Sequence, residues 1–238
     1  MSGGLALLSP YAPGWGGALL LAFWNSIQVA VCGFGVGLLL GTGGAFGKLY
    51  GGAVTRDLLA CYTTIVRAVP ELVLIVLLYY AGSDLLNGAL QLIGFGPVDV
   101  SGLAAGIFVI AVVQGAYSTE VLRGAILAVP AGQIEAARAY GMPPLMLLRR
   151  ITLPAMLPHA IPGLSNLWLI ATKDTALLAV VGFGELTLAT RQAAGATKSY
   201  FLFFTAAGLL YLLLTLGSNF VIRRIEKRAR RGLTRGAA

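Results

Sequence analysis

The chain has 238 residues, of which 58% are apolar and only 11% are charged. This composition excludes an ordinary soluble domain and indicates a polytopic membrane protein. The formal net charge of +8 does not indicate nucleic-acid binding, because many of the basic residues fall in a tail between Arg223 and Arg235, where they would face anionic lipid.

Five charge-poor segments are long enough to cross about 30 Å of hydrocarbon. We expect membrane helices at residues 19–40, 58–81, 100–119, 158–172 and 200–222. The fourth segment is marginal, because Pro154, Pro158 and Pro162 precede or interrupt it and a regular helix is expected to begin only near the last of them. The expected fold class is therefore an all-α polytopic membrane protein with five transmembrane helices.

The first segment carries Gly33, Gly37 and Gly41 at every fourth position, a pattern typical of close helix packing. Contact within the subunit is favoured over a dimer seam. Residues 41–49 approach the pattern of a phosphate-binding loop, but they have one residue too many between the outer glycines and Leu49 in place of the hydroxyl that binds Mg²⁺. We therefore expect any ATP and Mg²⁺ to be bound by a partner subunit.

Charged and polar residues inside the spans are candidates for a transport pathway, because they are costly in lipid. Arg67 and Glu71 flank Pro70 in the second segment and either neutralise each other on one helical turn or belong to a kinked helix in which Glu71 meets a cationic substrate. Glu120 either pairs with Arg123 or serves as counter-charge to a substrate ammonium or guanidinium group. The richest polar stretch of the third segment comprises Gln114, Tyr117, Ser118 and Glu120.

The stretch at residues 133–154 predicts a short helix-turn-helix between the third and fourth spans. Good helix formers occupy 134–140, Gly141 can adopt the left-handed conformation that ends a helix, and Pro143 and Pro144 suit the first turn of a second helix. This elbow is either a docking surface for another protein or an amphipathic hairpin on the lipid headgroups. The apolar run at residues 176–184 is too short to span and is expected to be interfacial or re-entrant.

The elbow resembles the cytoplasmic EAA loop of permease subunits in binding-protein-dependent ABC importers, which have the type I permease fold. The resemblance rests on seven positions, namely Glu135, Ala136, Ala137, Gly141, Ile151, Leu153 and Pro154. It implies that the first four form a contact surface and its turn on an ABC ATPase subunit, while the last three lead back into the bilayer. It also implies an ATPase dimer, a second permease subunit and a periplasmic solute-binding protein.

The branch that this chain resembles imports histidine, arginine, lysine, ornithine or opines. The resemblance is carried by Arg67-x-x-Pro70, by residues 116–135 and by residues 173–177, where Asp174 either pairs with Lys173 or helps to form an outer gate. We expect a polar, basic amino acid as substrate. The candidate binding residues are Glu71, Gln114, Tyr117, Ser118, Glu120 and Asp174. A neutral or acidic cargo, a subunit without its own substrate site, and a passive channel or scaffold stay open as alternatives.

The distribution of Lys and Arg predicts the orientation in the membrane. With the N-terminus outside, the outer side receives only Lys173, Arg191 and Lys198, and all other basic residues fall on the inner side. We therefore expect a multi-pass protein whose elbow 133–154 and basic tail 223–238 lie in the cytoplasm. The resemblance implies that the membrane is the bacterial inner membrane. No spacing of Ser, Cys or His indicates an enzyme active site, and a single histidine, His159, does not indicate a metal site.

Overall fold

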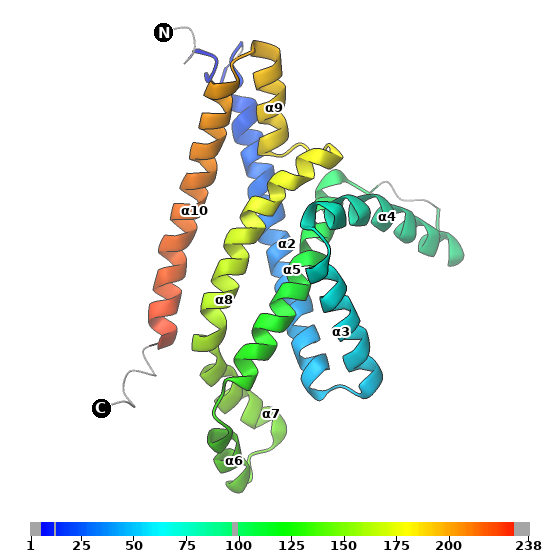
Figure 1. Cartoon of the computed structure of the whole chain (residues 1–238), viewed down its shortest axis with the longest axis vertical. Helices are drawn as coiled ribbons and strands as arrows, with labels where there is room; N and C mark the ends of the chain where they lie inside the picture. The colour runs from blue at the N-terminus through cyan, green and yellow to red at the C-terminus, as the bar shows by residue number, and fades with distance from the viewer. Residues whose placement is uncertain (1–5, 12, 97–99, 231–238) are drawn as a thin grey trace.

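The computed structural model describes residues 6–11, 13–96 and 100–230, and in this part it is an elongated helical bundle without β-strands (Figure 1). This confirms the expected all-α membrane fold, because five helical segments are long and apolar enough to cross a bilayer: Gly16–Tyr50, Glu71–Ala89, Gly102–Leu127, Pro144–Val181 and Tyr200–Ala229. The elements are α2 (Gly16–Tyr50), α3 (Ala53–Ala68), α4 (Glu71–Leu92), α5 (Gly102–Leu127), α6 (Ala131–Ala139), α7 (Pro144–Leu147), the π-helical turn η1 (Leu148–Thr152), α8 (Leu153–Asp174), the 3₁₀ helix η2 (Thr175–Val181), α9 (Leu186–Thr197) and α10 (Tyr200–Arg230).

Helices α2 and α5 form the centre of the bundle and pack with their backbones close together. A Cβ atom on Gly41 would lie 2.4 Å from the Cβ of Ser118, and a Cβ on Gly33 would lie 2.8 Å from Ile110. Gly37 faces the backbone of α5 in the same way. The glycine stripe therefore packs within the subunit, as predicted, and it lets two membrane helices approach closely.

The second segment is broken where a continuous span was expected at residues 58–81. Helix α3 ends at Ala68, Val69 is extended with φ −88° and ψ 138°, and α4 begins at Glu71. The residue before a proline is pushed out of the helical region, and Pro70 has no amide hydrogen to continue the helix. As a result α3 runs beside α2, while α4 turns away from the bundle (Figure 1).

Helix α8 begins earlier than the prolines suggested. It starts at Leu153 and continues through Pro158 and Pro162, so the expectation of a regular helix only from the last proline is wrong. Pro154 occupies the first turn, where its missing amide hydrogen costs little. Met156 and Ala160 are buried in a core cluster shared with α5, so tertiary packing holds the helix together despite its two internal prolines.

The end of the bundle opposite the elbow is closed by η2 and α9. Residues 175–181 form η2, and Gly182 then reverses the chain with φ 81°, so the run 176–184 does not cross the membrane, as predicted. The fully buried Glu185 caps α9 by accepting hydrogen bonds from the Thr187 and Leu188 amides at 2.8 and 2.7 Å and from the Tyr211 hydroxyl at 3.0 Å. Burial raises the pKa of Glu185, although these donors act in the opposite direction.

Helix α10 runs the length of the bundle, from the α9 end toward the end where α6 and α7 lie (Figure 1). It remains helical to Arg230, so the first part of the expected basic tail continues the membrane helix. The residues from 231 onward lie outside the described part of the chain.

Candidate functional site

The elbow has the turn that its sequence predicts. Gly141 has φ 72°, the Met142 amide donates to the Ala137 carbonyl at 3.1 Å, and the Gly141 amide donates to Arg138 at 2.9 Å. These two bonds are the pair that closes a helix with a left-handed glycine. Helix α7 then starts at Pro144 with Pro143 as its N-cap, as predicted. The elbow is therefore a structured unit of fixed geometry.

Only part of the expected contact surface of the elbow is accessible. Glu135 and Ala136 are exposed, whereas Ala137 is 4% exposed and faces inward. The largest exposed apolar side chains are instead Tyr140, at 87%, and Leu145, at 70%. Sequence analysis missed both, although large apolar side chains on a polar turn indicate a partner surface. Of the exit residues, Ile151 and Leu153 are half-buried and Pro154 is exposed.

The elbow is attached to the membrane helices through an apolar cluster. Ile134 of α6 and Leu153 of α8 pack against a core that includes Ala45, Leu122 and Met156. This core joins the elbow ends of α2, α5 and α8. A displacement of α6 would therefore act on three membrane helices at once, because packed interiors transmit strain.

A second group of predicted residues meets between three helices, and we call it the acid cluster. It consists of Glu71 at the start of α4, Gln114 and Tyr117 on α5, and Asp174 at the end of α8. The Gln114 amide nitrogen donates to the Asp174 carboxylate at 3.1 Å. The Glu71 carboxyl group faces both the Tyr117 hydroxyl and Asp174. Four of the six predicted binding residues therefore lie together.

The acid cluster has unused hydrogen-bonding capacity. The Gln114 side chain is fully buried. Its Oε1 atom nevertheless has no hydrogen-bond partner in the structure. A buried acceptor without a donor is costly and is expected to be satisfied by something else. Within the described part of the chain, Arg67 forms no ion pair with Glu71, and Lys173 forms none with Asp174. The self-neutralising pairs considered from the sequence are therefore not formed.

Arg67 nevertheless lies beside the acid cluster. It lies in the last turn of α3 and is exposed, and its charge acts on Tyr117. The region thus combines two carboxyl groups with one guanidinium group, which matches the opposite charges of an amino acid. Arg67 and Glu71 lie on opposite sides of the helix break at Val69 and Pro70.

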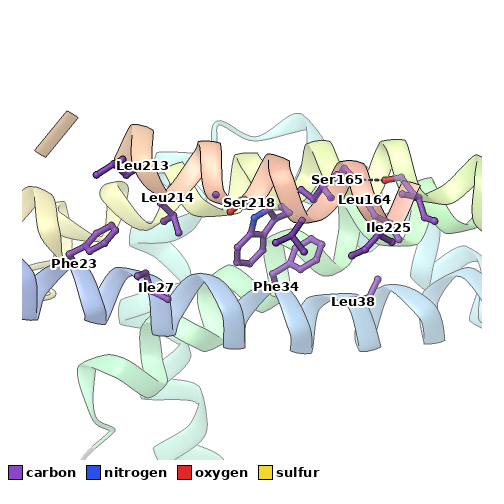
Figure 2. Close-up of a pocket in the computed structure, with 15 residues that line it drawn as sticks. Phe23, Ile27, Phe34, Leu38, Leu164, Ser165, Leu213, Leu214, Ser218 and Ile225 are labelled. Atoms are coloured by element: carbon purple, nitrogen blue, oxygen red, sulfur yellow. Dashed lines mark hydrogen bonds between the residues drawn. The ribbon is translucent and has the colours of Figure 1, made fainter. Parts of the chain in front are cut away.

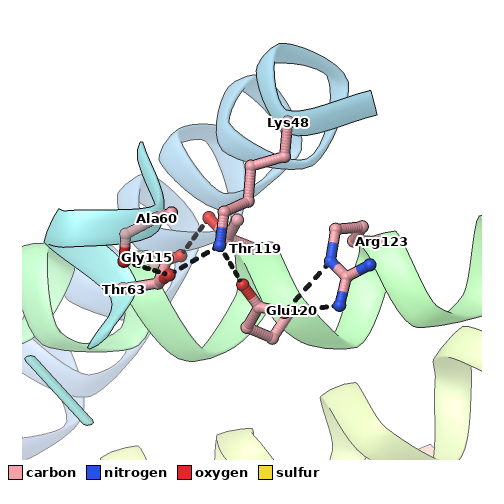
Figure 3. Close-up of polar contacts among 7 residues, drawn as sticks. All are labelled: Lys48, Ala60, Thr63, Gly115, Thr119, Glu120 and Arg123. Atoms are coloured by element: carbon pink, nitrogen blue, oxygen red, sulfur yellow. Dashed lines mark hydrogen bonds and ion pairs between the residues drawn. The ribbon is translucent and has the colours of Figure 1, made fainter. Parts of the chain in front are cut away.

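Glu120 belongs to a different group, shown in Figure 3. Lys48 of α2 contacts the Oε1 atom of Glu120 and donates to the Thr63 hydroxyl of α3 at 2.7 Å, while Arg123 contacts Glu120 at 3.0 Å. The pairing with Arg123 was one of the two alternatives from the sequence, and Lys48 is an addition. Glu120 thus has two cationic partners from its own chain and joins α2, α3 and α5.

Ser118 also lies apart from the acid cluster. Its side chain is fully buried against Gly41 of α2, and its hydroxyl has no hydrogen-bond partner in the structure. The position is part of the α2 and α5 contact.

Comparison with known proteins shows the family to which the chain belongs. Residues 33–231 match the family described as "Binding-protein-dependent transport system inner membrane component". The chain is 42% identical over 224 residues to the octopine transport system permease protein OccQ of Rhizobium radiobacter, with 94% of each protein covered. It is 36% identical over 222 residues to the histidine/lysine/arginine/ornithine transport system permease protein HisQ of Escherichia coli, covering 93% of this chain and 97% of the relative.

Solved structures agree on the fold. A chain of an amino acid ABC transporter crystallised with histidines superposes with a TM-score of 0.75 at 25% identity, covering 90% of this chain and 95% of the other. A chain of the inward-facing MetNI methionine ABC transporter has a TM-score of 0.73 at 20% identity, covering 90% and 97%. With the family match over most of its length, the chain belongs to the inner membrane components of binding-protein-dependent transport systems.

Proposed function

We propose that this permease subunit imports a cationic polar amino acid or an opine. The observation that carries the proposal is the acid cluster, in which Glu71 and Asp174 face each other beside the unpartnered Oε1 of Gln114. Two carboxyl groups concentrate negative charge that an ammonium or guanidinium group would neutralise. Relatives named for octopine and for histidine, lysine, arginine and ornithine support this substrate class.

Arg67 would bind the carboxylate of the same substrate. A zwitterion in a low-dielectric site needs a cationic partner for its carboxylate, and the fork of a guanidinium group matches that shape. The break between α3 and α4 separates Arg67 from Glu71, so the two ends of one substrate molecule would meet opposite charges. In this proposal Glu120 holds the helices in place and does not contact substrate.

The elbow would dock on an ABC ATPase subunit that binds the ATP and Mg²⁺. Exposed Glu135, Ala136 and Tyr140 would form the contact, with Gly141 fixing the turn between the two short helices. ATP-driven movement of the ATPase dimer would displace α6, and the shared apolar cluster would pass the movement to α2, α5 and α8. A second permease subunit and a periplasmic solute-binding protein complete the proposed assembly. The assembly would lie in the bacterial inner membrane, with the N-terminus of this chain outside and its elbow in the cytoplasm.

Uptake by the reconstituted transporter tests the substrate class. The complex with its ATPase and binding protein would be placed in proteoliposomes containing ATP, and uptake of labelled arginine, ornithine, octopine, glutamine and glutamate would be compared. We expect the cationic compounds and octopine to be transported well above glutamine and glutamate. The solute-binding protein has its own substrate preference, so a control must leave it out. ATP hydrolysis by the transporter alone would be measured at high concentrations of each substrate, and the same order of substrates should be found. Preference for glutamate would contradict the proposal.

A further inference from the structure

A long apolar groove lies between α2, α8 and α10 (Figure 2). Its volume is about 770 Å³. The 15 described residues that line it are apolar, glycine or serine, and include Phe23 and Leu38 of α2, Trp168 of α8, and Leu214 and Ile225 of α10. The Ser165 hydroxyl in its wall already donates to the Ile161 carbonyl at 2.7 Å. The groove therefore suits hydrocarbon and does not suit a polar solute.

The groove has the length of lipid chains. From Phe23 to Leu38 the rise of α2 is about 22 Å, which covers more than the roughly 15 Å that one leaflet of the hydrocarbon core occupies. The wall is apolar along this length, so acyl chains could lie against it without burying a polar group.

Basic residues continue the groove wall beyond the membrane core. On α10 the lining residues Leu214, Ser218, Val221 and Ile225 recur at helical spacing, and Arg228 lies one turn further along the same face. Arg224 lies at the edge of this face, with its guanidinium carbon 3.9 Å from the centre of the Phe220 ring. Arg223 and Lys227 occupy the opposite side of the helix. Positive charge is thus present at the end of the groove where a head group would lie.

We propose that this groove binds an anionic phospholipid, with its acyl chains between α2, α8 and α10 and its head group at Arg224 and Arg228. An empty apolar cavity of this size inside the bilayer would forfeit packing contacts, which acyl chains restore. A basic residue near the surface favours an anionic over a zwitterionic head group by about fivefold. The site rests on the membrane setting of the chain alone and does not depend on the substrate.

Trp168 lines the groove and reports directly on its occupant. The full-length chain with Trp15→Phe and Trp24→Phe keeps Trp168 as its one tryptophan of three. Its fluorescence would be measured in phosphatidylcholine vesicles that contain rising fractions of brominated phosphatidylglycerol or, separately, phosphatidylcholine with the same brominated chains. We expect half-maximal quenching at a fraction of the anionic lipid that is lower by about fivefold or more, since two arginines contribute.

Matched variants separate the site from general lipid contact. Arg224→Gln with Arg228→Gln should abolish the preference for phosphatidylglycerol, while Arg223→Gln with Lys227→Gln removes equal charge from the opposite face and should retain it. Gly217→Leu should reduce quenching by both lipids, because Gly217 lines the groove and a side chain there meets open space. Gly208→Leu, in a part of α10 that does not line the groove and where a side chain is also unobstructed, should not.

The assembled transporter supplies the second measurement. After purification in detergent, mass spectrometry would count the phosphatidylglycerol that the complex retains, and we expect at least half of it to be lost with Gly217→Leu. Equal quenching of Trp168 by the two lipids would overturn the proposal that the site selects an anionic head group. So would an equal loss of preference in the Arg224→Gln with Arg228→Gln variant and in the Arg223→Gln with Lys227→Gln variant. Equal retention by the parent and Gly217→Leu complexes would show that a protein partner covers the groove, and would overturn the proposal as well.

Discussion

Lys48 and Glu120 stand 72 residues apart in the sequence and form an ion pair that joins α2 to α5. Their side chains are 12% and 17% exposed, and Arg123 contacts the other oxygen of Glu120. Three charges are thus held in one half-buried network that also includes Thr63 of α3. Glu120 is the single counter-charge for both cations, so its loss would leave two positive charges close together without an anionic partner.

Loss of the negative charge at Glu120 should therefore destabilise the protein. In the Glu120→Gln variant Lys48 and Arg123 lose their counter-charge, and we expect the free energy of unfolding to fall by roughly 2 to 4 kcal/mol. Thermal unfolding of the purified transporter measures this change. The double variant Lys48→Met with Glu120→Met, which removes the opposing partners together, should be more stable than Glu120→Gln. If Glu120→Gln leaves the unfolding temperature unaltered and raises KM for arginine, Glu120 contacts the substrate and its structural role is contradicted.

The acid cluster predicts a different result for Asp174. Asp174→Asn removes one of the two carboxyl charges while keeping the shape, and a hydrogen bond to a charged group contributes about 1.5 to 3 kcal/mol. We therefore expect KM for arginine uptake to rise by at least about tenfold, with unfolding little changed. Asp84→Asn is the matched control, because Asp84 is an exposed carboxylate elsewhere on α4. Equal KM values for the two variants would remove Asp174 from the substrate site.

Much of this arrangement follows from the sequence because it depends on local rules. Hydropathy located the apolar segments, the spacing of Gly33, Gly37 and Gly41 indicated the α2 face that packs on α5, and Gly141 indicated the turn of the elbow. Each of these features is determined within a few residues of the chain.

Other features were predicted only in part. A kink at Pro70 was one of two alternatives, but residues 58–81 were expected to form one span, because hydropathy does not register the backbone restriction that a proline imposes on its neighbour. Either Arg123 or a substrate cation was expected to pair with Glu120, and Lys48 was missed because it is remote in sequence. The prolines of α8 were expected to delay a regular helix until near Pro162, but burial of Met156 and Ala160 against α5 outweighs that local preference.

The turn of the elbow provides a test of coupling. Gly141→Pro is incompatible with φ 72° and removes the amide that donates to Arg138. We expect ATP hydrolysis by the assembled transporter to continue while arginine uptake per ATP falls at least fivefold, with normal insertion in the membrane. Gly132→Ala in α6, where a side chain meets open space, is the control. Unchanged coupling in Gly141→Pro would show that the turn is not used to transmit movement.

Glu185 predicts a pH dependence of stability at the opposite end of the bundle. Its pKa is raised by burial, so folding favours the protonated carboxyl group, and the contribution is lost as the pH rises from the ordinary value of 4.5 through the pKa of the folded protein. The unfolding temperature of the parent should therefore decline relative to that of Glu185→Gln between pH 4.5 and pH 8. Parallel curves would show that the hydrogen bonds to the carboxylate fully offset its burial.

Tyr140 is the exposed residue by which docking of the elbow is most directly tested. Its side chain is 87% exposed beside Gly141, and a large aromatic side chain on a small interface contributes a major share of the binding free energy. We expect Tyr140→Ala to weaken association with the ATPase subunit at least tenfold in a pull-down titration from detergent. Tyr11→Ala removes a side chain that is 81% exposed and precedes α2 in the sequence, and it should leave association unchanged. If both variants bind the ATPase equally well, the contact lies on another face of α6 and α7. Ala137 is buried and would not form part of that face.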